Sequence, residues 1–362
     1  MKRLGIFLVL LTTTLACGAD WQIAEPGWRY EFPRDHHVHE NFKTEWWYFT
    51  GNLADAAGRR FGYELTFFRQ GIRPPGERAP QQSRFVVGDL KFAHFTVTDV
   101  AGKRFRFEQK ASRGAFGEAG FDGGDRLAWI DDWNLRLTSD GHFQLQAKAP
   151  ELAIDLQLTA VKPPVIHGQD GISQKAAGAG HASHYYSFTR LTSAGEMRAG
   201  GKTFTVQGES WFDHEWATNQ LAPDQVGWDW LSIDFADGSE LMLYRMRLAS
   251  GATDPTSSGT WVATDGATTH LPNEVFRMTP TDSWKSEATG ANYPVGWKVE
   301  IPGLSAQFTV KPALQNQELA LLPLAYWEGA VEIDGTRDGK AITGRGYLEL
   351  TGYAGPLREL QR

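Results

Sequence analysis

The sequence predicts an all-β protein, and two observations carry that prediction. Several short runs alternate apolar and polar residues, which is the pattern of strands with one face toward a core and one toward solvent. Turn-forming pairs such as Asp140-Gly141, Asp237-Gly238 and Asp334-Gly335 separate runs of this kind. No stretch has a convincing amphipathic helical period, so helices are expected to contribute little.

The expected strands follow from the same alternation. The clearest of them lie at residues 104–110, 133–139, 142–148 and 153–159. Many short antiparallel strands need a closed or two-layered arrangement to protect their edges, so barrels or sandwiches are expected.

Two stretches divide the chain. Residues 167–183 are rich in Gly, Ala and Ser and are predicted to be a mobile loop. Residues 217–227 form the better boundary, so we expect an N-terminal β-domain over 20–222 and a C-terminal β-domain over 223–362. A chain of 362 residues is long enough for each domain to have its own core. The functional motifs are expected to converge where the domains meet.

The composition is that of a globular protein and excludes several classes of function. With 41% hydrophobic and 22% charged residues, neither disorder nor a polytopic membrane fold is expected. A net charge of -7 and a pI near 5.8 argue against nucleic acid as the partner, because phosphate binding needs a basic surface. Aromatic residues make up 12% of the chain, and Trp clusters at 46–47, 211–216 and 228–230.

The first 19 residues are predicted to be an export signal, because a basic start is followed by a short apolar run and a small-residue exit. Cys17, the only cysteine, follows Leu15-Ala16 and precedes Gly18, which suggests lipidation of Cys17. Simple cleavage near Ala19 is the alternative. Either way, we expect an exported protein that is periplasmic or anchored to a membrane through lipid. The mature domain has no disulfide.

A carboxylate lies among large aromatic residues in the stretch TEWWYFTGNL. In a strand, Glu45 shares its face with aromatic residues at every second position, while Trp46 and Tyr48 point to the opposite face. Glu45 is either an acid kept for chemistry or a structural partner of an arginine, such as Arg69 or Arg190. Trp46 and Tyr48 are candidates for the wall of an apolar pocket.

The stretch WFDHEW places three ionisable residues in a row beside three aromatic ones. In extended form, Trp211 and Asp213 share one face and His214 and Trp216 share the other. Burial among aromatic rings favours the neutral acid and can raise its pKa by several units, as acid or base catalysis requires. Structural hydrogen bonding is the alternative.

Neighbouring stretches complete the aromatic set. GWDWLSIDF carries Trp228 and Trp230 on one face, ELMLYRMR carries Tyr244, and HYYSFTRL carries Tyr186. These residues are candidates for a ligand wall, although stripes of Met and aromatic residues more often form core.

Three common kinds of site are not expected. His36, His37 and His39 lie close together, but without thiol ligands or an HExxH motif, so no metal is expected. Ser210 lacks the following glycine of a nucleophile elbow. No GxGxxG follows a strand, so no dinucleotide and no other cofactor is expected.

Longer motifs resemble one known family. FPRDHHVHENFKTEWWYFTGNL, HYYSFTRL, GESWFDHEW, GWDWLSIDFADGSELMLYRMR, YWEGAV and GRGYLELTGY are similar to the AttH/CrtC family over about Phe32 to Tyr353. That family includes carotenoid 1,2-hydratases, also called hydroxyneurosporene synthases, and many exported proteins known only as predicted secreted hydrolases. The resemblance implies two lipocalin-like antiparallel β-barrel domains packed together, with a ligand pocket in or between them.

For the hydratases, the resemblance further implies acid catalysis without a cofactor. A carboxylic acid protonates a C=C bond, a carbocation forms against aromatic faces, and water adds. The His-x-Trp of the hydratase motif is matched by His214 and Trp216, with Asp213 beside them. On the next strand Tyr244 is present, but the expected nearby carboxylate is replaced by Arg245, so the proton donor is expected to be missing or relocated.

The leading hypothesis is therefore a protein that binds an apolar isoprenoid- or lipid-like ligand, and that acts as a hydratase or isomerase if it is an enzyme. Asp213 or Glu45 is the expected acid, His214 its proton partner, and Tyr244 a further catalytic residue. A carrier of hydrophobic cargo that works with a membrane transporter is the rival, and a hydrolase is a third possibility. The expected ligand wall consists of Trp46, Tyr48, Tyr186, Trp211, Trp216, Trp228 and Trp230.

Overall fold

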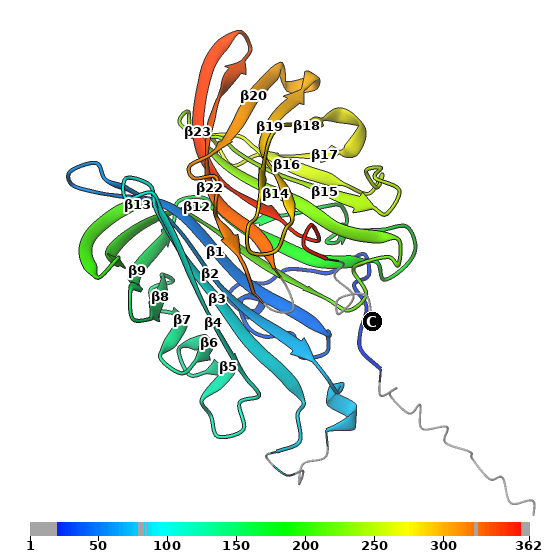
Figure 1. Ribbon diagram of the computed structural model, residues 1–362. Coiled ribbons are helices and arrows are strands. Elements are labelled where there is room, and N and C mark those ends of the chain that lie inside the picture. The colour runs from blue at the N-terminus through cyan, green and yellow to red at the C-terminus, as the bar shows by residue number, and fades with distance from the viewer. Residues whose placement is uncertain (1–19, 79–82, 84, 322–324, 356–362) are drawn as a thin grey trace, which may run out of the picture.

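The computed structural model describes residues 20–78, 83, 85–321 and 325–355, and strands dominate it (Figure 1). The all-β prediction is confirmed. The predicted export signal and Cys17 lie outside the described residues. Within them no helix is long and apolar enough to cross a membrane. The helices are short 3-10 turns: η1 (Arg34–His36), η2 (Pro75–Glu77), η3 (Asn273–Val275) and η4 (Pro302–Leu304).

The first sheet curls into a nearly closed barrel, in the order β4-β3-β2-β1-β13-β12-β9-β8-β7-β6-β5, with β10 and β11 also paired to β12 (Figure 1). All its pairings are antiparallel, as expected for strands joined by short turns. Its strands are β1 (Thr44–Asp55), β2 (Arg60–Gly71), β3 (Asp89–Asp99), β4 (Arg104–Ser112), β5 (Ala119–Gly123), β6 (Arg126–Ile130), β7 (Trp133–Leu137), β8 (Phe143–Lys148), β9 (Leu152–Ala160), β10 (Val165–Ile166), β11 (Ser173–Gln174), β12 (Ala182–Ala199) and β13 (Lys202–Ala217).

The second sheet forms a half-barrel, in the order β17-β16-β15-β14-β23-β22-β20-β19-β18, with β21 paired to β22. It begins at Gln225, eight positions after the first sheet ends at Ala217. Its strands are β14 (Gln225–Phe235), β15 (Glu240–Leu248), β16 (Ser258–Val262), β17 (Thr268–Pro272), β18 (Arg277–Lys285), β19 (Asn292–Ile301), β20 (Ala306–Pro312), β21 (Glu318–Leu319), β22 (Tyr326–Arg337) and β23 (Lys340–Leu350).

Each sheet has its own core, and a third core lies where the sheets meet. The barrel interior contains Trp47, Phe49 and Phe212, and the half-barrel contains Trp297 and Trp327. The sheets approach closely because β2 carries a glycine at the contact. A Cβ atom on Gly62 would lie 2.8 Å from the Cβ of Ala330 in β22.

The Gly-rich stretch 167–183, predicted to be a mobile loop, is instead packed between the two sheets. Several of its side chains are buried, including His167, Ser173 and Lys175. Polar contacts with the second sheet hold it there: Ser173 Oγ lies 3.2 Å from Tyr244 Oη, and Gln225 Nε2 donates to the carbonyl of Lys175 over 2.7 Å. Small residues therefore serve close packing here rather than mobility.

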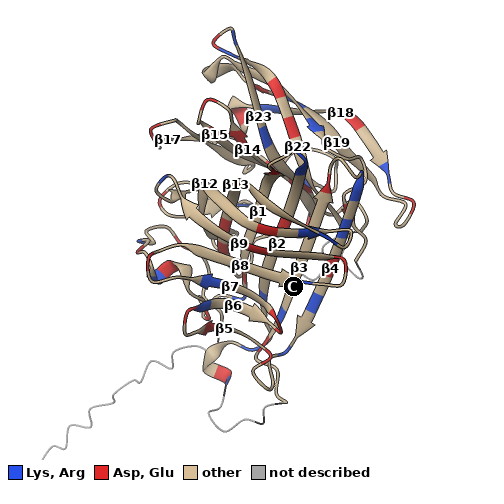
Figure 2. Cartoon of the chain, turned by 90° about the vertical axis from the view of Figure 1, so that its left-hand side faces the viewer, with Lys and Arg blue, Asp and Glu red and all other residues tan. Residues whose placement is uncertain are grey.

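Charged residues occur along the strands of both sheets (Figure 2). One charge cluster that joins the sheets is centred on Glu240, whose side chain is fully buried. Arg190 Nε of β12 lies 2.6 Å from Glu240 Oε1, and Lys162 Nζ lies 2.8 Å from Oε2. Arg190 also donates to the carbonyl of Phe235 over 3.1 Å.

We expect Arg190→Gln to lower the free energy of unfolding in urea by about 2–3 kcal/mol. Removing the sole partner of a buried charge costs about 3–5 kcal/mol, and here Lys162 still compensates Glu240. Lys298→Gln is the control, because the Lys298–Glu300 pair is more than one-third exposed and should be worth about 1 kcal/mol or less. An equal loss of unfolding free energy in the two variants would contradict the idea that Arg190 stabilises the contact between the sheets.

Candidate active site

The predicted site residues fall into two groups, one inside the barrel and one between the two sheets. β1 and β13 are antiparallel neighbours, with Tyr48 opposite Asp213 and Glu45 opposite Trp216. Trp46, Tyr48, Trp211, Asp213, Trp228, Trp230 and Tyr244 lie between the sheets, whereas Glu45, Tyr186, His214 and Trp216 lie inside the barrel. Asp213 and His214 therefore point to opposite faces. The expected proton partnership between them does not form, because successive residues of a strand alternate in direction.

The interface between the sheets is lined by aromatic rings that meet edge to face. The Trp211 and Trp230 rings lie 6.2 Å apart at 79°, and the Tyr48 and Trp230 rings 5.3 Å apart at 84°. Trp46 and Trp228 are only partly buried and lie at the margin of this cluster. The buried members are Tyr48, Tyr185, Trp211, Leu221, Trp230, Met242, Tyr244, Met246, Ala330 and Tyr347.

Asp213 is buried against this wall and accepts three hydrogen bonds. Tyr185 Oη donates to Oδ2 over 2.8 Å, Trp211 Nε1 donates to Oδ1 over 2.5 Å, and Ser187 Oγ also donates to Oδ1. Tyr185 in turn accepts from Trp230 Nε1 over 3.1 Å, which links Asp213 to the second sheet. Burial raises the pKa of Asp213 to about 7, even though the three donors act to lower it. Asp213 can therefore exchange a proton near neutral pH.

Three glutamates that the sequence reasoning missed join Asp213 in the interface: Glu64 of β2, Glu328 of β22 and Glu349 of β23. Tyr48 Oη donates to Glu328 Oε1 over 2.5 Å. The Oε2 atoms of Glu64 and Glu328 are buried without a hydrogen-bond partner among the described residues. Each is a polar atom that a bound molecule or water could satisfy.

These glutamates are held in the neutral form. Burial raises the pKa of Glu349 to about 8, and burial together with neighbouring carboxylates raises the pKa values of Glu64 and Glu328 well above their usual range. Within the described part of the chain, these three glutamates form no ion pair with Lys, Arg or His. Asp213 forms none there either. Carboxyl groups without a cation partner retain their protons when water is excluded.

Lys175 brings a positive charge into the interface, where it pairs with Glu215. Its Nζ lies 3.1 Å from Glu215 Oε1 and sits over the Tyr244 ring, 4.1 Å from the centroid. The Tyr244 hydroxyl donates to the carbonyl of Gln174 over 2.8 Å, so Tyr244 is held by the same loop. Lys175 was not singled out in the sequence, because a lone lysine in a Gly-rich stretch carries no pattern.

A serine beside a histidine occurs in the interface, but its geometry does not suit a nucleophile. Ser187 Oγ lies 2.7 Å from His167 Nε2, and His167 Nδ1 lies 2.9 Å from Thr260 Oγ1. Because Ser187 donates its proton to Asp213, His167 Nε2 must donate to Ser187 and Nδ1 must accept from Thr260. His167 therefore presents a proton to the serine oxygen instead of accepting one.

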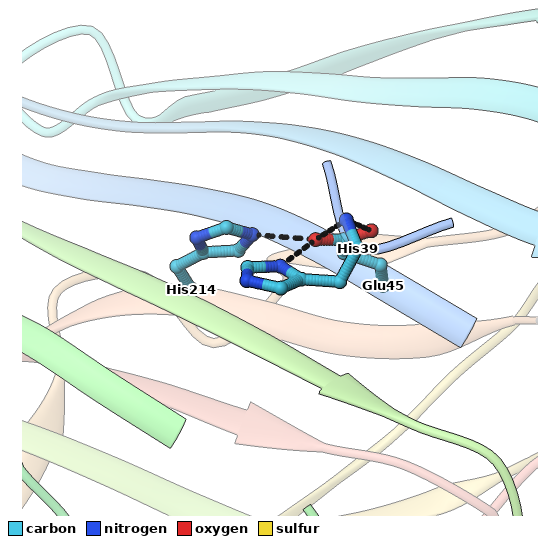
Figure 3. A group of neighbouring side chains, drawn as sticks. All are labelled: His39, Glu45 and His214. Carbon is cyan, nitrogen blue, oxygen red and sulfur yellow. Dashed lines mark hydrogen bonds and ion pairs between the residues drawn. The ribbon is translucent and has the colours of Figure 1, made fainter. Parts of the chain in front are cut away.

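Inside the barrel, Glu45 is surrounded by donors (Figure 3). Its Oε1 lies 2.8 Å from His39 Nδ1 and 3.0 Å from His214 Nε2, and its Oε2 lies 3.3 Å from Arg69 Nε. Burial acts to raise the pKa of Glu45, but the hydrogen bonds from His214 and His39 hold it well below its usual range. Glu45 is thus an ionised carboxylate and is not suited to donate a proton. Of the two arginines considered, Arg69 is its partner, while Arg190 pairs with Glu240.

The fold and the site together define a class: a β protein of two packed sheets with an aromatic, acid-lined interface. The AttH-like family description matches residues 23–353, so the chain belongs to the AttH-like family. The family resemblance inferred from the sequence motifs is confirmed.

Three relatives place this fold among known proteins. A Nitrosomonas europaea protein, whose crystal structure is described as that of a candidate AttH, has a TM-score of 0.82 and 33% identity, over 92% of this chain and 99% of that one. Kievitone hydratase of Nectria haematococca has a TM-score of 0.71 at 13% identity, over 90% and 93% of the two chains. The dehydratase asqC of Emericella nidulans is 23% identical over 70% of this chain and 75% of that protein.

The raised pKa values predict how stability depends on pH. Asp213 and Glu349 bind protons more tightly in the folded chain than in the unfolded chain, where carboxyl pKa values are about 4. Their stabilising contribution is therefore complete below about pH 4 and is lost as the pH rises through about 7 to 8. In urea unfolding between pH 6 and pH 9, Glu349→Gln should lose less stability than the native protein.

Glu196→Gln is the control for this pH series, because Glu196 is exposed and its environment changes little on unfolding. It should keep the native pH dependence. A Glu349→Gln curve parallel to the native curve would mean that Glu349 is ionised in the folded protein.

Proposed function

We propose that this protein is a hydratase or dehydratase that adds water to, or removes water from, a carbon–carbon double bond of an apolar substrate held between the two sheets. The observation that carries the proposal is a set of carboxyl groups with raised pKa values, Asp213 and Glu349 foremost, which lie against an aromatic wall and form no ion pair within the described residues. Support also comes from the relatives, since one is named a hydratase and another a dehydratase.

In the hydration direction, Glu349 acts as the acid. With a pKa of about 8 it is neutral at pH 7, and its proton forms a new C–H bond with the π electrons of the alkene. The positive charge that develops on the other carbon is stabilised by the faces of Trp211 and Trp230. Water is excluded from most of the interface, which strengthens these interactions.

Asp213 acts as the base. Its pKa of about 7 leaves a substantial ionised fraction at neutral pH, and Tyr185, Ser187 and Trp211 hold the carboxylate in place. The oxygen of water forms a C–O bond with the cationic carbon, and the proton lost from that water passes to Asp213. Proton return from Asp213 to Glu349 restores both groups. Dehydration follows the same steps in reverse.

The substrate class is an isoprenoid- or lipid-like molecule. The walls are predominantly aromatic and aliphatic, and the few polar groups converge on one region, as in sites that bind apolar molecules in a fixed orientation. Trp46 and Trp228, at the margin of the cluster, are suited to contact the ligand as it enters. A carrier that works with a membrane transporter would need this wall but not the proton exchange of Asp213 and Glu349.

We expect Glu349→Gln and Asp213→Asn to lower turnover about 10²- to 10⁴-fold, the usual contribution of a general acid or base. The assay follows incorporation of heavy oxygen from labelled water into a panel of unsaturated isoprenoids and lipids, with tertiary alcohols for the reverse direction. Ligand binding, followed by quenching of Trp fluorescence, should change little.

Glu318→Gln is the matched control, since Glu318 is a buried carboxyl that Tyr293 and Thr289 hold away from the aromatic wall, and it should keep native turnover. If label never enters a product and the two site variants bind the same lipid as the native protein, a carrier is the better description. Turnover of model esters that survives Asp213→Asn would favour a hydrolase.

Export and lipid anchoring form part of the same proposal. We expect Cys17→Ala to move the mature protein from the membrane fraction to the soluble periplasmic fraction. The variant would lack the acyl chains that hold the lipidated protein on the membrane. The measurement is fractionation together with the intact mass of the purified chain. An unmodified mature N-terminus near residue 20 would exclude lipidation and leave export intact.

A further inference from the structure

A compact group of three side chains lies inside the barrel, on the opposite face of β1 and β13 from the proposed active site (Figure 3). His39 Nδ1, His214 Nε2 and a carboxylate oxygen of Glu45 all lie within 4.8 Å of one another. Glu45 and His214 are fully buried, and the His39 side chain is only 10% exposed. Two imidazoles and one carboxylate thus converge on one small space.

The hydrogen bonds on the far side of each ring favour a hydrogen on the outer nitrogen. His214 Nδ1 lies 2.9 Å from the main-chain carbonyl of Asp35, which only accepts, and 3.2 Å from the hydroxyl of Tyr186, which can accept as well. His39 Nε2 lies 3.3 Å from the carboxylate of Asp35, which Arg34 also binds, so this nitrogen is a donor. The second nitrogen of each ring then faces Glu45 Oε1.

Glu45 Oε1 is an acceptor, and each of the two ring nitrogens that face it can offer a lone pair. The centroids of the two rings lie 5.6 Å apart. One divalent cation would satisfy both nitrogens and the carboxylate oxygen together.

We propose that His39, Glu45 and His214 bind a divalent transition-metal ion, with Zn²⁺ as the probe. Two histidines and one glutamate are an established ligand set for zinc, with bonds of about 2.0–2.1 Å. Ligand atoms of a tetrahedral centre with such bonds lie about 3.3 Å apart, close to the 2.8 and 3.0 Å separations between Glu45 Oε1 and the two nitrogens. Imidazole ligands suit zinc better than magnesium or calcium.

The surroundings of the three residues resemble those of a built metal site. Metal-bound histidines commonly donate their other nitrogen to a carboxylate or a main-chain carbonyl, and Asp35 supplies both acceptors here. The His39 ring is stacked on Trp216 at 3.7 Å, and the His214 ring on Trp47 at 4.6 Å. Because these two histidine rings are already held in place, they would lose little conformational entropy when a metal ion binds.

The metal would have a structural role that is independent of the proposed function. His39 lies in the segment before β1, while Glu45 and His214 belong to paired strands, so the ion would pin that segment to the barrel. No metal was expected from the sequence, although the cluster that contains His39 was considered. His39 and His214 are far apart in the chain, and only the fold brings them to the same carboxylate.

The test uses the full chain without a histidine tag, loaded with Zn²⁺ and passed over a chelating resin. Elemental analysis should find about one zinc per chain, and zinc should raise the midpoint of thermal unfolding, an effect that EDTA reverses. His39→Gln should lose both effects. His94→Gln is the control, because His94 is also buried but contacts Tyr326 instead of this group, and it should retain the metal.

Asp35→Asn tests the hydrogen bond that the Asp35 carboxylate accepts from His39. It also keeps the proposal testable if His39→Gln does not fold. It keeps all three ligands and should weaken zinc binding about 10- to 100-fold. The proposal is overturned if the folded native protein retains no zinc after loading. It is also overturned if every foldable variant, including Asp35→Asn, binds zinc as tightly as the native chain.

Discussion

The pairing of β1 with β13 is the constraint on which the rest of the structure depends. In this register Tyr48 lies opposite Asp213, and Trp47 lies opposite His214. Because side chains alternate along a strand, each strand contributes one set of residues to the barrel interior and another to the interface with the second sheet. Shifting the pairing of β1 and β13 by one residue would exchange the two sets. Burial in the barrel interior and burial in the interface therefore specify the same register.

The two faces treat carboxyl groups in opposite ways. Glu45 lies inside the barrel beside His39, His214 and Arg69, and it remains ionised. Glu328 is fully buried in the interface among other carboxyl groups, and its pKa is raised well above its usual range. Burial is common to both sites, so burial alone does not decide the charge. The presence or absence of a cation partner decides it.

The second sheet makes the interface a dry environment. Arg190 and Lys162 join the sheets at Glu240, the Tyr48 hydroxyl reaches Glu328, and Trp230 reaches Tyr185. The barrel alone would expose Asp213 to water and lower its pKa toward that of a surface carboxylate. An architecture of this kind does not by itself specify a reaction.

The sequence by itself determined the fold class, the family and the faces of the key strands. Alternation in TEWWYFTGNL separates Trp46 and Tyr48 from Glu45, and alternation in WFDHEW separates Asp213 from His214, because a period of two needs no long-range information. An aromatic cluster was expected from the clustering of Trp, but Tyr186 and Trp216, which were counted in it, lie inside the barrel. Arg69 was considered as a partner of Glu45.

Only the tertiary structure decided which residues meet across the chain. Glu64, Glu328 and Glu349 stand in separate strands of two sheets, and each is unremarkable in its own stretch of sequence. Lys175 lies in a segment whose Gly and Ala content indicated mobility, and His39 precedes β1 by a few residues. Packing of the two sheets places the three glutamates near Asp213, and barrel closure places His39 beside His214. The reason is physical: local pattern records which face a residue occupies, whereas charge and protonation depend on neighbours that are distant in sequence.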